Sequence, residues 1–393
     1  MKKTLILLSI LLITKTFNLI SQDKPGVEVY LLTCGPGTET YSIYGHSAVR
    51  IRIPEKNTDM VYNWGVFDFN TTNFAWKFAK GRLDYMLGVE PLQNFLQGYF
   101  YEKRYVYSQK INLKPNEIEK LYLLITDNLK PENIKYRYDF FYDDCSTRIR
   151  DLIEKSVEDK LLYPPGEEGE VPTFRDLVGK YQNPYPWLNF GIDLIMGSSS
   201  DKESSFRDRM FLPIDLKDEF SQTVIYRDGK MIPLLQNPEI LLDFDPPSVR
   251  QKFLISPVFV FTLILIIIII LSTWLKGKKN NNLLDIIIFS IFSILAILMV
   301  FFNFFTDHQQ MKWNLNIIWL NPFILICLIT MILNKTGTVW FRIVFFISGA
   351  FLVIQLFLPQ EFNTAFFPIV LILIIRSSVR AGFEWNPLSL NNL

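Results

Sequence analysis

Two residues whose side chains can do chemistry stand in dense motifs that lie far apart in the sequence. His46 lies in Tyr41-Ser-Ile-Tyr-Gly-His-Ser-Ala-Val-Arg50, and Cys145 lies in Tyr138-Asp-Phe-Phe-Tyr-Asp-Asp-Cys-Ser-Thr-Arg148. The chain of 393 residues has only two histidines and three cysteines. A thiol is a useful nucleophile as the thiolate, and a nearby imidazole can accept its proton. The pair therefore indicates cysteine chemistry.

The segments around the two residues predict a strand and a helix that position them. Residues 48–53 alternate apolar and polar side chains, so His46 is expected at a strand start. After Cys145, apolar residues at helical spacing predict a helix that begins at Asp144 or Cys145, with an aspartate as its cap. A helix N-terminus carries about half a positive charge and has free N–H groups, which would stabilise a thiolate or an oxyanion.

A base histidine usually needs a third polar group that fixes its tautomer. Asn63 is our candidate, because residues 60–65 are expected to form a strand that returns beside the one starting at His46. Tyr44 and Asp68 compete for this role. The expected catalytic set is therefore His46, Cys145 and Asn63.

An oxyanion formed at this site would need hydrogen-bond donors. The backbone N–H groups of Cys145 and Ser146 are the first candidates. Hydroxyl donors are offered by two tyrosines, Tyr138 and Tyr142. Asp143 and Asp144 would raise the thiol pKa if their carboxylates faced the sulfur. As helix caps they would bind backbone N–H groups and face away.

Non-catalytic interpretations of the pair also stand. Cys145 would serve as a buried structural thiol, or would form a disulfide with Cys34, and His46 would be a hydrogen-bonded strand histidine. A zinc site is disfavoured, because one histidine and two cysteines in this region lack a ligand cluster at metal spacing. We expect neither a metal nor a cofactor.

Several other residues have both a structural and a functional interpretation. Gly45 is a turn residue that would also let a substrate approach His46. Two exposed arginines, Arg50 and Arg148, are potential phosphate ligands. His308 is expected in a loop on the same side as His46 and Cys145, either facing them or solvated, and Cys327 is expected to be an apolar filler in a membrane helix.

The composition divides the chain sharply and predicts an exported domain. Residues 1–21 have a basic start and an apolar run, which is typical of a signal peptide; an uncleaved anchor helix is the alternative. Residues 22–232 are expected to form an α+β domain, with strands at 27–32 and 104–113 and helices at 72–80 and 115–128. Residues 197–205 suit a flexible or partly ordered loop, and residues 233–255 suit a linker. The net charge of +1 gives no sign of nucleic-acid binding.

The C-terminal part is expected to be a membrane domain, residues 256–380, with a cytoplasmic tail at 381–393. Its five apolar segments are 256–275, 283–302, 317–333, 339–358 and 362–375. About 20 residues suffice to cross the hydrocarbon core. The basic residues gather in alternate connections: Lys276, Lys278, Lys279, Lys335, Arg342, Arg376 and Arg380. The positive-inside rule puts those connections in the cytoplasm and the large domain in the periplasm, anchored in a bacterial inner membrane.

The ordered motifs resemble the Lnb N-terminal periplasmic domain family over residues 25–225. The resemblance is carried by Thr33-Cys-Gly-Pro-Gly37, Tyr44-Gly-His46-Ser-Ala-Val-Arg50, Tyr62-Asn-Trp-Gly-Val-Phe-Asp-Phe69, the Cys145 motif and Phe211-Leu-Pro213. Tyr44 stands where the family motif has phenylalanine. Asp144-Cys145-Ser146 is also similar to the Asp-Cys-Ser motif of NlpC/P60 cysteine peptidases. With the histidine first, the order resembles the circularly permuted branch of that papain-like superfamily.

The resemblance implies a membrane-bound acyltransferase. Lnb-type enzymes are proposed to acylate the N-terminal cysteine of diacylated bacterial lipoproteins, and His46 and Cys145 match the family histidine and cysteine. The implied partners are a phospholipid acyl donor, a diacylated lipoprotein acceptor and the membrane. A cell-wall cysteine peptidase or amidase, and a non-enzymatic sensor or scaffold, are the alternatives.

Overall fold

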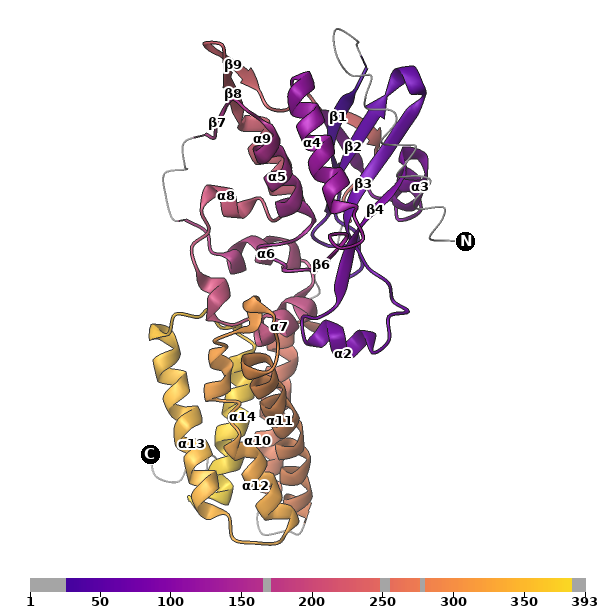
Figure 1. Ribbon diagram of the computed structural model, residues 1–393. Coiled ribbons are helices and arrows are strands. Elements are labelled where there is room, and N and C mark those ends of the chain that lie inside the picture. The colour runs from indigo at the N-terminus through magenta and orange to yellow at the C-terminus, as the bar shows by residue number, and fades with distance from the viewer. Residues whose placement is uncertain (1–25, 165–170, 248–254, 276–279, 384–393) are drawn as a thin grey trace.

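The computed structural model describes residues 26–164, 171–247, 255–275 and 280–383, as a mixed α/β domain that sits on one end of a helical bundle (Figure 1). The expected signal peptide lies outside the described residues, as do Lys276, Lys278 and Lys279 and most of the expected C-terminal tail.

The domain is built on a seven-stranded sheet in which the paired strands are antiparallel. Its strand order is β10 (Glu239–Leu242), β5 (Val106–Lys110), β1 (Glu28–Cys34), β2 (His46–Ile53), β3 (Thr58–Val66), β4 (Asp84–Pro91) and β6 (Lys135–Arg137). The expected strands at the histidine motif are therefore present, and β2, which begins at His46, lies in the middle of the sheet. The antiparallel pairing agrees with the predicted α+β class.

Alternation of side chains along the strands gives the sheet two apolar faces. One face is covered by α4 (Pro115–Asn128), α5 (Cys145–Ser156) and α9 (Pro213–Gln222), and its core includes Trp64 and Ile149. The other face is covered by α3 (Leu92–Tyr101), where Ala48 and Phe95 are buried. Helix α5 thus reaches the sheet from the face opposite to α3, and its first residue is Cys145.

The remaining elements lie around this sheet and toward the bundle. The small sheet consists of β7 (Lys160–Leu162), β8 (Val224–Arg227) and β9 (Lys230–Pro233). The connecting helices are α2 (Phe74–Ala79), α6 (Phe174–Gln182), α7 (Pro186–Ile195) and α8 (Phe206–Arg209). The prediction of a linker from residue 233 is wrong for its first part, because β10 pairs with β5 as an edge strand of the main sheet.

The bundle consists of α10 (Pro257–Trp274), α11 (Asn280–Phe304), α12 (Phe323–Ile332), α13 (Thr338–Ile354) and α14 (Phe366–Arg380). Four stretches among the described residues are long and apolar enough to cross a membrane: Pro257–Trp274, Asn282–Phe304, Leu315–Ile332 and Thr338–Phe357. The expected fifth span is α14, which has 15 residues, most of them buried against α10 and α13. Pro368 lies in its first turn, where no backbone hydrogen bond is lost.

Helix α14 begins and ends later than the predicted segment 362–375, and this changes the role of its arginines. Arg376 and Asp285 of α11 are both fully buried and lie 2.6 Å apart, and Arg376 also donates to Ser272 at 2.6 Å. Arg380 pairs with the same carboxylate. The two arginines are therefore partners inside the bundle and not charges of a loop.

The domain is fixed to the bundle through part of the 197–205 segment, and of the two predictions for it, flexible or partly ordered, the structure supports the ordered one. The 3₁₀ turn Ser198–Asp201 packs on the 3₁₀ turn Gln309–Met311, which follows α11. Gly197 donates to the Gln310 carbonyl at 2.8 Å, and Ser199 Oγ donates to the Gln309 carbonyl at 2.7 Å. A Cβ at Gly197 would lie 1.9 Å from the Lys312 carbonyl oxygen, so only glycine permits this contact.

Candidate functional site

His46 and Asn63 contact each other across two neighbouring strands. The register of β2 and β3 pairs Val49 with Tyr62, and its continuation places Asn63 diagonally from His46 on one face of the sheet. The distance between His46 Nε2 and Asn63 Oδ1 is 2.5 Å. Since a carbonyl oxygen only accepts, Nε2 carries the proton and Nδ1 is left as the basic nitrogen. Asn63 thus has the geometry of a group that fixes the histidine tautomer.

Cys145 is the first residue of α5, and Asp144 is its cap. Asp144 Oδ1 accepts from the Thr147 backbone N–H at 2.8 Å, while the Asp144 N–H donates to Thr147 Oγ1 at 2.7 Å. This reciprocal box caps the helix at the residue before the thiol, so that α5 begins at Cys145, as the cap motif predicts. The carboxylate is occupied by the cap, and the helix N-terminus is directed at the sulfur.

Asp143 also has its own partner. Arg148 binds it with two hydrogen bonds, of 2.6 and 2.8 Å, and the guanidinium stacks 3.5 Å from the centre of the Tyr136 ring. Arg148 is therefore committed to Asp143. Arg50 is committed to Asp59 in the same way, with two hydrogen bonds of 2.7 Å, so neither arginine is a free phosphate ligand.

The histidine, the thiol and one tyrosine face a common point beside the backbone of β3. A Cβ added to Gly65 would lie 3.9 Å from His46 Cε1, 3.9 Å from Cys145 Cβ and 3.6 Å from Tyr138 Cε2. Gly65 has a φ of +96°, which a larger residue rarely adopts. The missing side chain therefore leaves space between the three groups. The sequence analysis did not single out Gly65, although it stands in the Tyr62-Asn-Trp-Gly motif.

Desolvation by the surrounding protein favours the neutral forms of His46 and Cys145. It lowers the pKa of His46 below 6.5, and the hydrogen bond to Asn63 opposes this shift. It raises the pKa of Cys145 above 9.0, against hydrogen bonds from the Ser47 backbone N–H, the Ser146 hydroxyl and backbone, and the Tyr138 hydroxyl. The resting pair is thus thiol and imidazole, which suits proton transfer during the reaction rather than a standing ion pair.

The donors around the sulfur include one that the sequence analysis missed. Cys145 and Ser146 supply the backbone N–H groups expected at the helix start, and Tyr138 supplies a hydroxyl. The Ser47 N–H adds a donor from β2, and the Ser47 hydroxyl accepts from Ser146 Oγ at 3.2 Å. The strand that carries His46 therefore also carries a donor to the Cys145 sulfur.

Other candidates from the sequence lie elsewhere. Tyr44 Oη accepts from Gln182 at 2.8 Å, and Asp68 caps a turn by accepting from the Asn70 N–H at 2.8 Å. Tyr142 is 49% exposed, and its ring packs on that of Phe174. His308 donates through Nε2 to the Phe78 carbonyl at 2.8 Å, so it joins the bundle to α2 and does not face Cys145.

Cys34 is free, and so are Cys145 and Cys327. The alternative of a disulfide between Cys34 and Cys145 is therefore wrong. Cys34 pairs with His46 in the β1–β2 register and is completely buried, and burial raises the pKa of its thiol to about 12. An unreactive thiol thus lies next to the histidine strand.

Within the described ranges, no group of His, Cys, Asp and Glu is suited to hold a metal ion.

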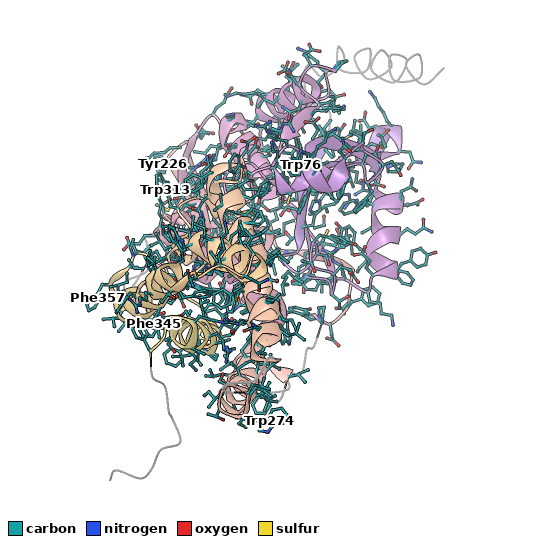
Figure 2. All side chains as sticks on the ribbon, turned by 90° about the horizontal axis from the view of Figure 1, so that it is seen from below. Trp76, Tyr226, Trp274, Trp313, Phe345 and Phe357 are labelled. Carbon is teal, nitrogen blue, oxygen red and sulfur yellow. The ribbon has the colours of Figure 1, made fainter. Side chains whose placement is uncertain are left out.

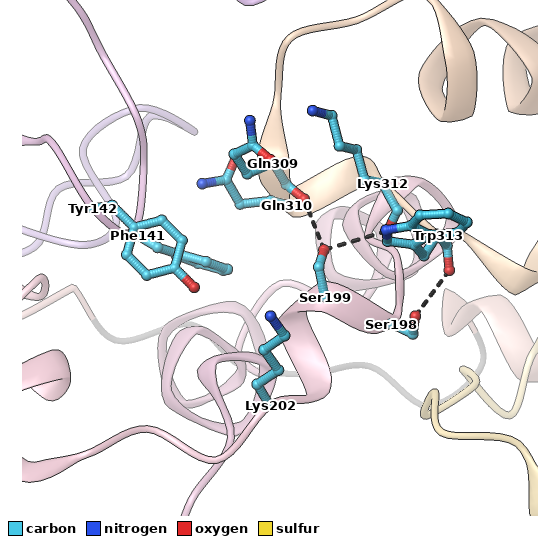
Figure 3. Close-up of a pocket in the computed structure, with 9 residues that line it drawn as sticks. All are labelled: Phe141, Tyr142, Ser198, Ser199, Lys202, Gln309, Gln310, Lys312 and Trp313. Atoms are coloured by element: carbon cyan, nitrogen blue, oxygen red, sulfur yellow. Dashed lines mark hydrogen bonds between the residues drawn. The ribbon is translucent and has the colours of Figure 1, made fainter.

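A second feature, a cavity, lies beside the loop that precedes Cys145, at the junction with the bundle. This cavity of about 290 Å³ is lined by residues of the domain and of the 309–313 segment. Figure 3 shows these lining residues. The lining residues are Phe141, Tyr142, Ser198, Ser199, Lys202, Gln309, Gln310, Lys312 and Trp313. Gln310 Nε2 donates to Asp139 Oδ1 at 2.5 Å, and the same oxygen accepts from the Phe141 N–H at 3.0 Å. The bundle therefore holds the turn that leads to Cys145.

Comparison with known protein families assigns both parts of the chain. The model described as the Lnb N-terminal periplasmic domain matches residues 16–178, and the model described as the Lnb transmembrane domain matches residues 249–384. The chain belongs to the Lnb family. No curated protein and no solved structure matches it. Both halves of the Lnb architecture are thus present in one chain, with His46 and Cys145 in the first and the apolar helices in the second.

Proposed function

We propose that this protein is a membrane-bound cysteine acyltransferase that N-acylates the N-terminal cysteine of diacylated bacterial lipoproteins, with a phospholipid as acyl donor. The observation that carries the proposal is the arrangement of Cys145, His46 and Asn63 in a domain packed onto a membrane bundle. The thiol stands at a helix start, and the histidine ring is held by Asn63 at 2.5 Å with Nδ1 left free. This is the general arrangement of nucleophile, base and orienting group.

In the first step, the thiol takes the acyl group from the donor. His46 Nδ1 accepts the Cys145 proton as the sulfur attacks an ester carbonyl carbon of the phospholipid. The oxyanion is stabilised by N–H groups at the start of α5 and by the Tyr138 hydroxyl. When the ester C–O bond breaks, the imidazolium returns its proton to the leaving oxygen. The products are a Cys145 thioester and a lysophospholipid.

In the second step, the thioester passes the acyl group to an amine. The α-amino group of the lipidated cysteine attacks the thioester carbonyl, and the neutral imidazole accepts a proton from the nitrogen. Breakage of the C–S bond gives an amide, and the imidazolium returns the proton to the sulfur. The cycle ends with the thiol and the imidazole both neutral, which is the state that burial of the two groups favours.

Transfer to an amine is favoured over transfer to water by the surroundings of the sulfur. Cys145 is 5% exposed, and the core around it is apolar. A site that excludes water protects a reactive acyl-enzyme from hydrolysis. Both proposed substrates carry acyl chains that stay in the bilayer, and an enzyme attached to a multi-helix bundle meets them there.

We further propose a permuted papain-like fold and an orientation with the domain in the periplasm. The fold proposal is supported by the order of the chain, in which the histidine strand precedes the cysteine helix. The orientation is supported by the course of α14, whose Arg380 binds Asp285 near the start of α11, whereas α11 ends at the domain. Five crossings of a bacterial inner membrane would then put Lys335 and the C-terminus in the cytoplasm.

The test is the mass of a lipoprotein N-terminus from bacterial cells that lack lipoprotein N-acylation. Cells expressing the wild-type protein should add one acyl group, and Cys145→Ala and His46→Ala should add none. Cys327→Ala is the matched control, since Cys327 is buried in a membrane helix and should leave acylation intact. No added mass with the wild type would overturn the transferase proposal. Cleavage of cell-wall fragments by the same protein would then favour a peptidase or amidase.

A further inference from the structure

An exposed aromatic surface lies on α2 and the loop before it. The residues Phe67, Phe69, Phe74, Trp76 and Phe78 form this surface, which we call the aromatic strip. Phe69 is 67%, Trp76 57% and Phe78 51% exposed, whereas Phe67 and Phe74 are half-buried. The four phenylalanine rings contact one another, and the Trp76 ring instead contacts Phe301 of α11. Contiguous exposed apolar surface of this kind marks an interaction site.

The strip lies at the level of the membrane bundle's end. The ring of Trp76 is centred 5.6 Å from that of Phe301, which lies in the last turn of the candidate span Asn282–Phe304. Thr306 Oγ1 donates to the Ala79 carbonyl at 3.0 Å, and the Asp307 N–H donates to the Lys80 carbonyl at 2.9 Å. Helix α2 is therefore fastened beside the end of α11, where Figure 1 shows it at the base of the domain.

The charges next to the strip are those of a membrane boundary. The Lys80 ammonium lies 5.0 Å from the centre of the Trp76 ring, and Arg82 pairs with Asp307 at 2.6 Å. Tryptophan and lysine are enriched where hydrocarbon meets headgroups, since the ring lies in the apolar layer and the ammonium reaches the phosphates. Seen from the bundle side, Trp76 lies on the domain beside the bundle's helices (Figure 2).

Ring contacts continue from the strip to the nucleophile. Phe67 is centred 4.7 Å from Phe69 and 5.2 Å from Tyr85, and Tyr85 is centred 4.5 Å from Tyr138. The Tyr138 hydroxyl is directed at the Cys145 sulfur. A run of ring contacts thus leads from Phe78, which lies beside His308 after the end of α11, through Phe74, Phe67 and Tyr85 to Tyr138 next to Cys145.

We propose that the aromatic strip lies in the outer part of the bilayer leaflet on the domain side, and that it receives an acyl chain of the donor phospholipid and leads it along Tyr85 and Tyr138 to Cys145. The membrane is the expected occupant because Trp76 packs on a residue within a candidate membrane span. A partner protein would have to displace lipid from that position. The delivery of the chain depends on the proposed function, whereas the depth of the strip does not.

The depth is tested with nitroxide labels in lipid nanodiscs of phosphatidylethanolamine and phosphatidylglycerol. Phe78→Cys is the labelled site, and Tyr226→Cys is the matched control, since Tyr226 is 48% exposed on the small sheet of the domain. The Phe78 label should relax more with oxygen than with a water-soluble nickel complex, and the Tyr226 label should show the reverse. Equal nickel accessibility at both sites would overturn the proposal. Unsubstituted protein gives the background labelling of the three buried cysteines.

The delivery role is tested with a Trp76→Ser, Phe78→Ser double variant and two donors. With phospholipid vesicles, transfer should fall about tenfold or more, because two aromatic contacts with lipid are lost. With a water-soluble short-chain thioester, the double variant should match the wild type. If the wild type uses neither donor, the acyltransferase proposal itself fails. If the wild type uses both and the double variant keeps full vesicle activity, the strip proposal alone fails.

Discussion

Two polar clusters in this protein differ in whether their groups are paired with one another. At the far end of the bundle, Asp285, Arg376 and Ser272 are buried charges and a hydroxyl that bind one another. In the domain, His46 is half-buried and Cys145 is buried, desolvation favours the neutral form of both, and the empty side-chain position at Gly65 lies between them. A structural cluster needs every group to be satisfied, because an unpaired buried charge is costly. A reactive cluster needs a nitrogen and a sulfur that remain free for the substrate.

The largest expected effect is a loss of activity, and it concerns only the cluster of His46 and Cys145. Cys145→Ala should reduce acyl transfer by at least about 10⁴-fold, since the nucleophile is lost. Unfolding should change little, with a stability loss of about 1 kcal/mol, because only one buried sulfur is removed. Thermal unfolding in detergent and lipoprotein mass spectrometry measure both quantities on one sample. If the Cys145→Ala protein still acylated lipoproteins, the cluster of His46 and Cys145 would not be the reactive site.

The bundle cluster should respond in the opposite way. Asp285→Asn leaves Arg376 buried without its counter-ion and should cost about 3–5 kcal/mol of stability. The activity per folded molecule should stay at the wild-type level, because the cluster lies at the other end of the bundle from α2. The measure is the denaturation midpoint, together with transfer rates normalised to folded protein.

A matched variant sharpens this second prediction. In Asp285→Leu with Arg376→Met, the buried pair is replaced by apolar side chains of similar size, which often leaves stability unchanged. We therefore expect the double variant to unfold near the wild-type midpoint and well above Asp285→Asn. A double variant as unstable as the single one would show that the stability depends on the other contacts of the cluster, those of Arg380 with Asp285 and of Arg376 with Ser272.

Much of the candidate site could be predicted from local patterns. Alternation along 48–53 and 60–65 indicated two neighbouring strands, and this pairing is what brought Asn63 into consideration beside His46. The cap at Asp144 followed from the helical spacing after Cys145. Both inferences depend on contacts between residues close in sequence, for which residue type and period carry the information.

What could not be predicted depends on contacts between distant segments. Strand β10 pairs with β5 across more than 100 residues, and its short length and nearby prolines resemble those of a linker. Position 197 requires glycine because its backbone lies against the Lys312 carbonyl, which belongs to the segment after α11. Tyr138 was one of two tyrosine candidates four residues apart, and the turn held by Gln310 decides which one faces the sulfur. Such choices are made by tertiary packing, which no local period records.

A smaller effect is expected at the residue that orients the base. Asn63→Ala should lower kcat by about 100-fold, within the range of general base catalysis, because the imidazole loses its fixed tautomer. Since the Asn63 hydrogen bond raises the pKa of His46, its loss should move the acid limb of the pH profile to lower pH. Asn63→Asp still accepts from Nε2, and its charge should move the acid limb to higher pH. Identical profiles for all three proteins would mean that Asn63 has only a packing role.

The smallest expected effects concern the wild-type protein and its pH dependence. Transfer requires neutral His46, whose pKa is lowered by burial, so the acid limb of kcat/KM should have its midpoint below 6.5. Free thiol ionisation is a different event, because burial raises the pKa of Cys145 above 9.0. Alkylation of Cys145 by iodoacetamide should therefore rise with a midpoint above 9.0, far from the acid limb of transfer.

A single shared midpoint for transfer and alkylation would contradict this separation. It would indicate a thiolate–imidazolium pair at rest, as two coupled groups titrate together. The Asp285 cluster differs, because its charged side chains bind one another in the structure. In the proposed mechanism, His46 and Cys145 stay uncharged until a substrate binds. The difference in pH between the midpoints of transfer and of alkylation measures how strongly desolvation favours these neutral forms.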